Sequence, residues 1–185
     1  RLPNFGGRTA LDSSGRIYLS GESETATGTF EGVIVRWTTA GILDGSFGTG
    51  GVLHFNAGND PISGIGTTLD KEEYFFHATY DPYTDRVIAV GTSADNATLK
   101  GFAARFKMDG TLDTSFGDNG TKLLVPPDRP AESFGGGQGA LAQDQCNQVQ
   151  VDRLGRYVIL CATVTNDGAA ETAILRLNSN GTFNK

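Results

Sequence analysis

The chain repeats itself three times along its length. Three aspartates in equivalent positions, Asp12, Asp81 and Asp152, lie 69 and 71 residues apart. Each copy has an alternating apolar segment, a polar loop and a second apolar segment that leads into a glycine-containing turn. A fixed long period indicates one supersecondary unit that is copied and that buries its apolar face against its neighbours. The repeat therefore constrains the architecture, although it reveals no activity.

Each copy predicts four short strands. Residues 16–20, 86–90 and 156–160 contain Ile, Val and Tyr, which favour the pleated, half-buried surface of a strand. The 26 glycines are about twice the usual share of roughly 7% and stand at turns between apolar segments. Four-stranded units that repeat around an axis are typical of propeller blades. We therefore predict an all-β, propeller-like body of three repeats, each of about 70 residues.

We interpret the chain as one domain with repeat units at about 8–75, 76–146 and 147–185. The sequence around Asn184 matches the second copy up to Asp113, and the next segment of that copy resembles residues 4–7. Residues 1–7 would then supply the last strand of the third unit and close the ring, which removes exposed strand edges. The alternative is that the three units belong to a larger propeller, since propellers commonly have about 4–8 blades.

Charge and hydrophobicity exclude several partners. The chain has a net charge of −6, and its 15 Lys and Arg residues are scattered. Phosphate binding needs a concentrated basic surface, so we do not expect nucleic acid or an anionic membrane as a partner. No run of 18 apolar residues exists, so we expect no membrane insertion.

The two cysteines are predicted to form a disulfide. If the hairpin turn pairs Asp152 with Gly155, Cys146 faces Cys161. Facing strand positions place Cα atoms about 4.5–5.5 Å apart, which is within disulfide reach. A disulfide indicates an extracellular or periplasmic protein. The alternative is two buried free thiols in a cytosolic protein.

Two insertions, at residues 56–73 and 126–145, interrupt the pattern at the same point, after the fourth strand. Loops on a rigid scaffold commonly carry binding, although a plain surface insertion remains the alternative. Carbohydrates are held by aromatic faces and by Asn, Asp, Gln and Arg side chains. The candidate ligand-binding residues in and beside the insertions are Asn59, Asp60, Tyr74, Asp128, Arg129, Phe134 and Gln138.

Residues 41–51, reading GILDGSFGTGG, and 110–120, reading GTLDTSFGDNG, resemble the signature of the delta-60 repeat family. The lead-in arginines Arg36, Arg105 and Arg176 resemble it as well. This family consists of bacterial propeller-like repeats, many of them in large surface or secreted proteins. The resemblance implies a scaffold for recognition without catalytic residues. The third copy departs from the motif, with Phe183-Asn184 in place of Leu-Asp.

The residues repeated in this motif are predicted to be structural, because one active site does not need three copies of each member. Phe47 and Phe116 are expected in the core between blades. Asp44 and Asp113 are expected to cap their turns through backbone N–H groups and to pair with the lead-in arginines.

No catalytic set is recognisable. The Gly-x-Ser-x-Gly and Walker motifs are absent, and the acidic loops lack the EF-hand pattern. His54 and His77 are too few for a zinc site, which needs three or four ligands. We predict no metal, no cofactor and no enzyme activity.

Together these observations predict a non-enzymatic recognition or adhesion module at the bacterial cell surface. It would belong to a larger surface or fibre protein and bind a cell-surface glycan or protein. The internal three-fold repetition would suit a homotrimer on a trimeric stalk. The alternatives are a structural spacer domain and a propeller-type hydrolase or lactonase.

Overall fold

The computed structural model describes residues 4, 6, 8–56, 72–94, 99–124, 145–164 and 170–184. In this part of the chain the backbone forms strands and turns. None of the described residues belongs to a helix that could cross a membrane. The prediction of an all-β protein is confirmed.

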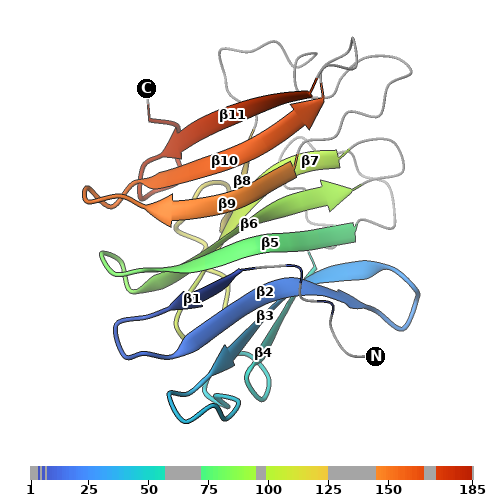
Figure 1. Ribbon diagram of the computed structural model, residues 1–185, viewed down its shortest axis with the longest axis vertical. Coiled ribbons are helices and arrows are strands. Elements are labelled where there is room, and N and C mark those ends of the chain that lie inside the picture. Colours follow the sequence, from blue (N-terminus) through green and yellow to red (C-terminus); the bar gives the residue numbers. More distant parts are fainter. Residues whose placement is uncertain are drawn as a thin grey trace.

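The strands form three antiparallel sheets that follow one another in the sequence (Figure 1). The first sheet contains β1 (Thr9–Leu11), β2 (Ile17–Glu24), β3 (Phe30–Trp37) and β4 (Val52–Phe55). The second sheet contains β5 (Glu72–Asp81), β6 (Arg86–Ala94), β7 (Leu99–Phe106) and β8 (Thr121–Leu123). The third sheet contains β9 (Gln145–Val151), β10 (Tyr157–Val164) and β11 (Ala170–Leu177). Strands that are consecutive within a repeat pair side by side, so each sheet is one copy of the repeat.

The sheets pack face to face in sequence order (Figure 1). Strand β5 packs against β1, β2 and β3, and we call this contact the first junction. Strand β9 packs against β5, β6 and β7, and we call this contact the second junction. Among the described strands, no pair from the first and third sheets makes a comparable contact. The structure confirms three repeated antiparallel sheets, but a propeller of three repeats that closes into a ring is not confirmed.

The predicted closing role of residues 1–7 is also not confirmed. Asn4 pairs with Glu22 of β2 through two backbone hydrogen bonds, of 2.9 and 3.0 Å. Tyr74 occupies the same place in the second sheet, opposite Thr92. Asn4 therefore pairs with β2 on the same edge of the first sheet as β1. In the other two repeats the first strand likewise pairs along most of the second strand.

The two junctions have different cores. In the first junction Phe55, Phe75, Phe102 and Phe106 form a cluster with ring centroids 5.4–5.9 Å apart. The second junction contains mainly aliphatic side chains and both cysteines. Phe47 is fully buried in the first core and Phe116 in the second, which confirms their predicted place between sheets.

Cys146 and Cys161 form the predicted disulfide, but the hairpin register differs from the one expected. Asp152 donates its backbone N–H to the carbonyl of Arg156 at 2.9 Å. Asp152 therefore pairs with Arg156, one residue beyond the expected partner Gly155. A bulge between Leu160 and Cys161 then removes the offset and brings the cysteines opposite each other. The second sheet has a bulge at the equivalent point, beside Phe75.

Candidate functional site

A pair of stacked aromatic rings connects the first two sheets at one end of their strands. Phe30 begins β3, and Tyr74 lies near the start of β5. Their ring centroids are 5.8 Å apart and the ring planes are inclined by 29°. Both side chains are half-buried, so part of the ring surface is open to solvent. Tyr74 was predicted from the sequence to bind ligand, whereas Phe30 was not.

The hydroxyl of Tyr74 donates a short hydrogen bond to Oε2 of Glu72. Burial raises the pKa of Tyr74, and the hydrogen bond to Glu72 and the nearby carboxylate of Glu22 raise it further. The phenol therefore stays protonated at neutral pH, with its proton directed at Glu72. This contact fixes the ring and leaves the remaining lone pairs of the carboxylate as acceptors.

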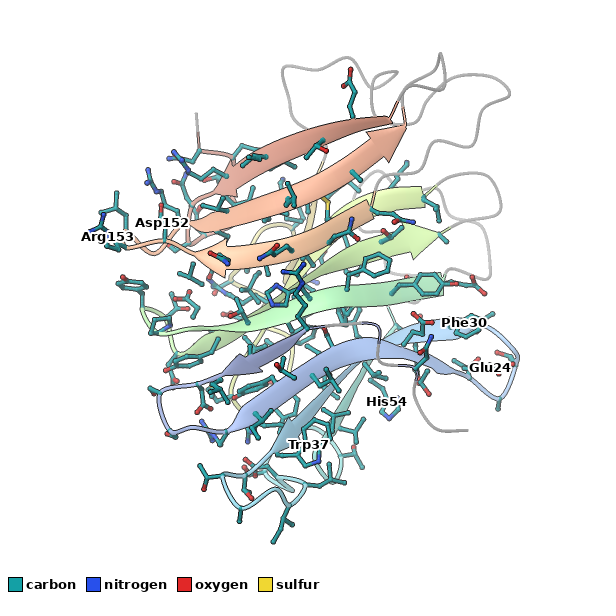
Figure 2. The ribbon with its side chains drawn as sticks, in the orientation of Figure 1. Glu24, Phe30, Trp37, His54, Asp152 and Arg153 are labelled. Atoms are coloured by element: carbon teal, nitrogen blue, oxygen red, sulfur yellow. A yellow bond between two sulfur atoms is a disulfide. The ribbon has the colours of Figure 1, made fainter. Side chains whose placement is uncertain are left out.

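Further glutamates lie at the same end of the first sheet. Asn4 donates a 3.0 Å hydrogen bond from Nδ2 to Oε1 of Glu22. Glu31 pairs with Nδ1 of His54 at 2.7 Å. Figure 2 shows Glu24 and Phe30 together at this end, with Asp152 and Arg153 at the opposite end. Glu22 and Glu24 share the face of Phe30, so the aromatic pair lies beside carboxylates that could accept hydrogen bonds from a ligand, whereas Glu31 and His54 lie on the other face of the sheet.

Both insertions begin and end near this end of the strands. The first runs between Phe55 at the end of β4 and Glu72 at the start of β5. The second runs between Leu123 at the end of β8 and Gln145 at the start of β9. β5 and β9 begin on the same side of the molecule (Figure 1). Six of the predicted ligand-binding residues lie outside the described residues: Asn59, Asp60, Asp128, Arg129, Phe134 and Gln138.

The two histidines lie in separate environments. His54 pairs with Glu31 on β4 and β3. His77 is buried, and its Nδ1 accepts a 3.1 Å hydrogen bond from the backbone N–H of Val149. Burial and the nearby charge of Arg8 lower the pKa of His77, so its ring is neutral at pH 7. Within the described ranges, no group of three or more His, Cys, Asp or Glu side chains is placed to hold a metal ion.

The repeated arginines and aspartates form the pairs predicted from the sequence in the first two units. Nε of Arg36 lies 2.9 Å from Asp44, and Nε of Arg105 lies 2.9 Å from Asp113. Both aspartates also accept hydrogen bonds from the N–H and hydroxyl of the serine two residues later, as expected for a turn cap.

These arginines also cross the junctions. Nη1 of Arg36 donates to the carbonyl of Met108 in the second sheet's turn at 2.6 Å. Arg105 makes the equivalent bond to the carbonyl of Ser179 in the third unit. The guanidinium groups are buried over the rings of Phe47 and Phe116, at 4.6 and 5.0 Å from the ring centroids. They hold adjacent sheets together and are not available to a ligand.

Part of the second repeat is similar to a known protein family. A family model described as a domain of unknown function (DUF5122) β-propeller matches residues 85–116. This segment contains β6, β7 and the turn that carries Asp113 and Phe116. No curated protein matches the chain. The match, together with the three repeated sheets, supports assignment of this protein to a β-propeller-like repeat family.

Proposed function

We propose that this domain is a non-enzymatic recognition module of delta-60-type repeats that binds a cell-surface glycan through the end that carries Phe30 and Tyr74. The stacked pair is the observation that carries the proposal. Aromatic rings with an apolar face and a polar edge suit the C–H face of a sugar ring. Carboxylates such as Glu72 suit its hydroxyl groups, because an ionised carboxylate accepts several hydrogen bonds.

The position of the pair supports the same proposal. Phe30 and Tyr74 lie on strands fixed by pairing and by packing across the first junction. A site on a rigid scaffold loses little conformational entropy when a ligand binds. The first insertion returns to the scaffold at Glu72, two residues before Tyr74. The predicted residues of the insertions can therefore add specificity beside a rigid aromatic contact.

We place the domain outside the cell, within a larger bacterial surface or fibre protein. The disulfide between Cys146 and Cys161 supports this location, because disulfides persist in oxidising compartments. A homotrimer formed through such a fibre would multiply weak glycan contacts by avidity.

The proposal is tested by a glycan array with the purified domain, multimerised to raise avidity. We expect reproducible binding to one class of sugar. Tyr74→Ala should reduce this binding at least about tenfold, which corresponds to roughly 1.4 kcal/mol. Tyr83→Ala is the matched control, because Tyr83 is an exposed tyrosine in the turn at the opposite end of the second sheet and should leave binding unchanged.

Two outcomes would contradict this function. If the folded, multimerised domain binds no glycan, a spacer role or a protein ligand becomes the better explanation. If glycan binds and Tyr74→Ala and Tyr83→Ala bind equally well, the site lies elsewhere. A circular dichroism melt of each variant separates loss of binding from loss of the fold.

A further inference from the structure

The third sheet has one buried and one exposed face. Tyr157 and Ile159 of β10 are fully buried against the second sheet. The alternate residue Leu160 and its β11 neighbour Ile174 point the other way and are 37% and 72% exposed. A shallow groove lined by apolar side chains and by Gln148 and Gln150 crosses this side. We call Gln148, Gln150, Val158, Leu160, Ile174 and Arg176 the outer face of the third sheet.

The second sheet shows what the same positions do when they are covered. Val90 and Ala103 are the equivalents of Leu160 and Ile174, and both pack in the core of the second junction. In the first sheet the equivalent Ile34 packs in the core of the first junction. The outer face of the third sheet therefore has the register and the apolar character of a junction surface, with no sheet against it among the described residues.

The first sheet has the complementary surface on its far side. Val87 and Phe106 of the second sheet are buried in the first junction, and Leu112 packs against them. Their equivalents in the first sheet are Ile17, Trp37 and Leu43.

These three residues are more exposed than their equivalents. Ile17 and Trp37 are only half-buried, and Leu43 is 47% exposed. Trp37 lies on the side of the first sheet away from the second sheet (Figure 2). We call Leu11, Ile17, Leu19, Trp37 and Leu43 the outer face of the first sheet. Val33 and Val35 lie on the same side of β3 but are only 0% and 4% exposed, so this side is open to solvent only in part.

The polar contacts of the junctions are also incomplete at these two faces. Arg36 and Arg105 each donate to a turn carbonyl of the following unit. Their equivalent Arg176 is exposed and its guanidinium has no hydrogen-bond partner among the described residues. The carbonyl that would accept such a bond in the first unit is that of Thr39, which is exposed and accepts none from the described residues.

We propose that the outer face of the third sheet binds the outer face of the first sheet in a second copy of this chain, in the register of the two internal junctions. Arg176 of one copy then donates to the carbonyl of Thr39 in the other, and Leu160 and Ile174 pack against Ile17 and Trp37. The first sheet is the occupant that the structure favours, because it carries both the apolar positions and the free turn carbonyl that a junction uses.

Such an interface is heterologous, since the two surfaces differ. After the first contact the pair of chains keeps one unused surface of each kind, one on each chain, so assembly continues until a ring closes or a filament grows. This surface is separate from the proposed glycan site, so the two proposals can fail independently.

Sedimentation velocity over a wide concentration range tests the proposal with the chain as it is. We expect concentration-dependent species larger than one chain. Ile174→Lys should weaken the association at least about tenfold, because it places a charge in an apolar contact. Leu154→Lys is the matched control, because Leu154 is 73% exposed but lies in the β9–β10 turn, and it should associate like the unchanged protein.

A mixing experiment tests the orientation. Leu43→Lys removes the first-sheet face and Ile174→Lys removes the third-sheet face, so each variant alone should remain monomeric. An equal mixture retains one intact pair of faces and should give dimers of the two variants and nothing larger. A monomeric unchanged protein at every concentration would overturn the proposal. So would full association of Leu43→Lys alone, because that would require two identical faces to meet.

Discussion

In the first junction Phe75 packs against Gly32 of β3, whereas in the second junction Cys146 takes the equivalent place against Gly101 of β7. A Cβ atom on Gly32 would lie 2.6 Å from the ring of Phe75, and one on Gly101 would lie 2.4 Å from the sulfur of Cys146. Both glycines are therefore needed for the close approach of the next sheet's inner strand. Both junctions therefore keep the same space above a glycine. One junction fills it with an aromatic ring and the other with a disulfide.

The two junctions also share a polar feature: in each, a buried tyrosine hydroxyl lies between an aspartate and an arginine. In the first sheet Tyr18 donates to Asp12 at 3.0 Å and accepts from Arg36 at 3.4 Å. In the second junction Tyr157 comes from the opposite sheet, donates to Asp81 at 2.7 Å and accepts from Arg105 at 3.2 Å. Burial raises the pKa of each phenol to about 12, so both remain neutral donors. The hydroxyl is required between the Asp and the Arg, and either neighbouring sheet can supply it.

The largest expected effect comes from emptying the aromatic core of the first junction. Phe75→Ala removes a ring that is 1% exposed and contacts three other phenylalanines. We expect the free energy of unfolding to fall by about 3–5 kcal/mol. Chemical denaturation measures this loss, and Phe76→Ala is the control because Phe76 is only half-buried. Equal losses at the two positions would contradict the central role of Phe75.

Removing the disulfide of the second junction should lower the free energy of unfolding by a similar but smaller amount. The cysteines are 15 residues apart, and a loop of that size corresponds to about 3 kcal/mol in the free energy of unfolding. We expect the double variant Cys146→Ala, Cys161→Ala to lose about this amount under non-reducing conditions and to be unaffected by a reductant.

A swap variant sharpens the comparison. Cys146→Phe with Cys161→Gly installs the pair that the second sheet uses, Phe75 and Gly91, and should recover part of the loss. A double alanine variant as stable as the unchanged protein would show that the bridge is dispensable.

The smallest effect is a dependence on pH. Burial tends to raise the pKa of Asp113, but hydrogen bonds from Ser115 and Arg86 and the charge of Arg105 outweigh it and lower this pKa to about 2. A carboxyl whose pKa is lower in the folded state stabilises the fold above its unfolded pKa of 3.8, and this contribution is lost as the pH falls toward 2.

We expect a loss of up to about 2 kcal/mol across this window. Asp113→Asn should flatten the dependence of unfolding on pH between 4 and 2, as measured by urea denaturation at a series of pH values. An unchanged pH profile in this variant would assign the acid sensitivity to other carboxyls.

Parts of the candidate site could be predicted from the sequence and parts could not. Tyr74 could be named as a candidate because it follows an insertion directly, and local order places it at the end of a strand; its ligand-binding role stays a prediction. No sequence feature pointed to Phe30, because its contact with Tyr74 depends on a strand that begins more than forty residues later. The closing role predicted for residues 1–7 is not confirmed for a related reason, since short glycine-containing segments resemble one another and pairing decides which sheet they join; Asn4 pairs with Glu22 of the first sheet.

The sequence alone determined the three repeats, the alternating strands, the capped turns and the partner of each cysteine, because these depend on residues close together or on a repeated period. The tertiary structure decided how the sheets meet: the bulge that aligns Cys146 with Cys161, the arginines that reach into the next unit, and the exposed apolar side chains on the far sides of the first and third sheets. These features depend on distances between side chains of different sheets. A repeated local pattern predicts each sheet but does not fix the packing between sheets.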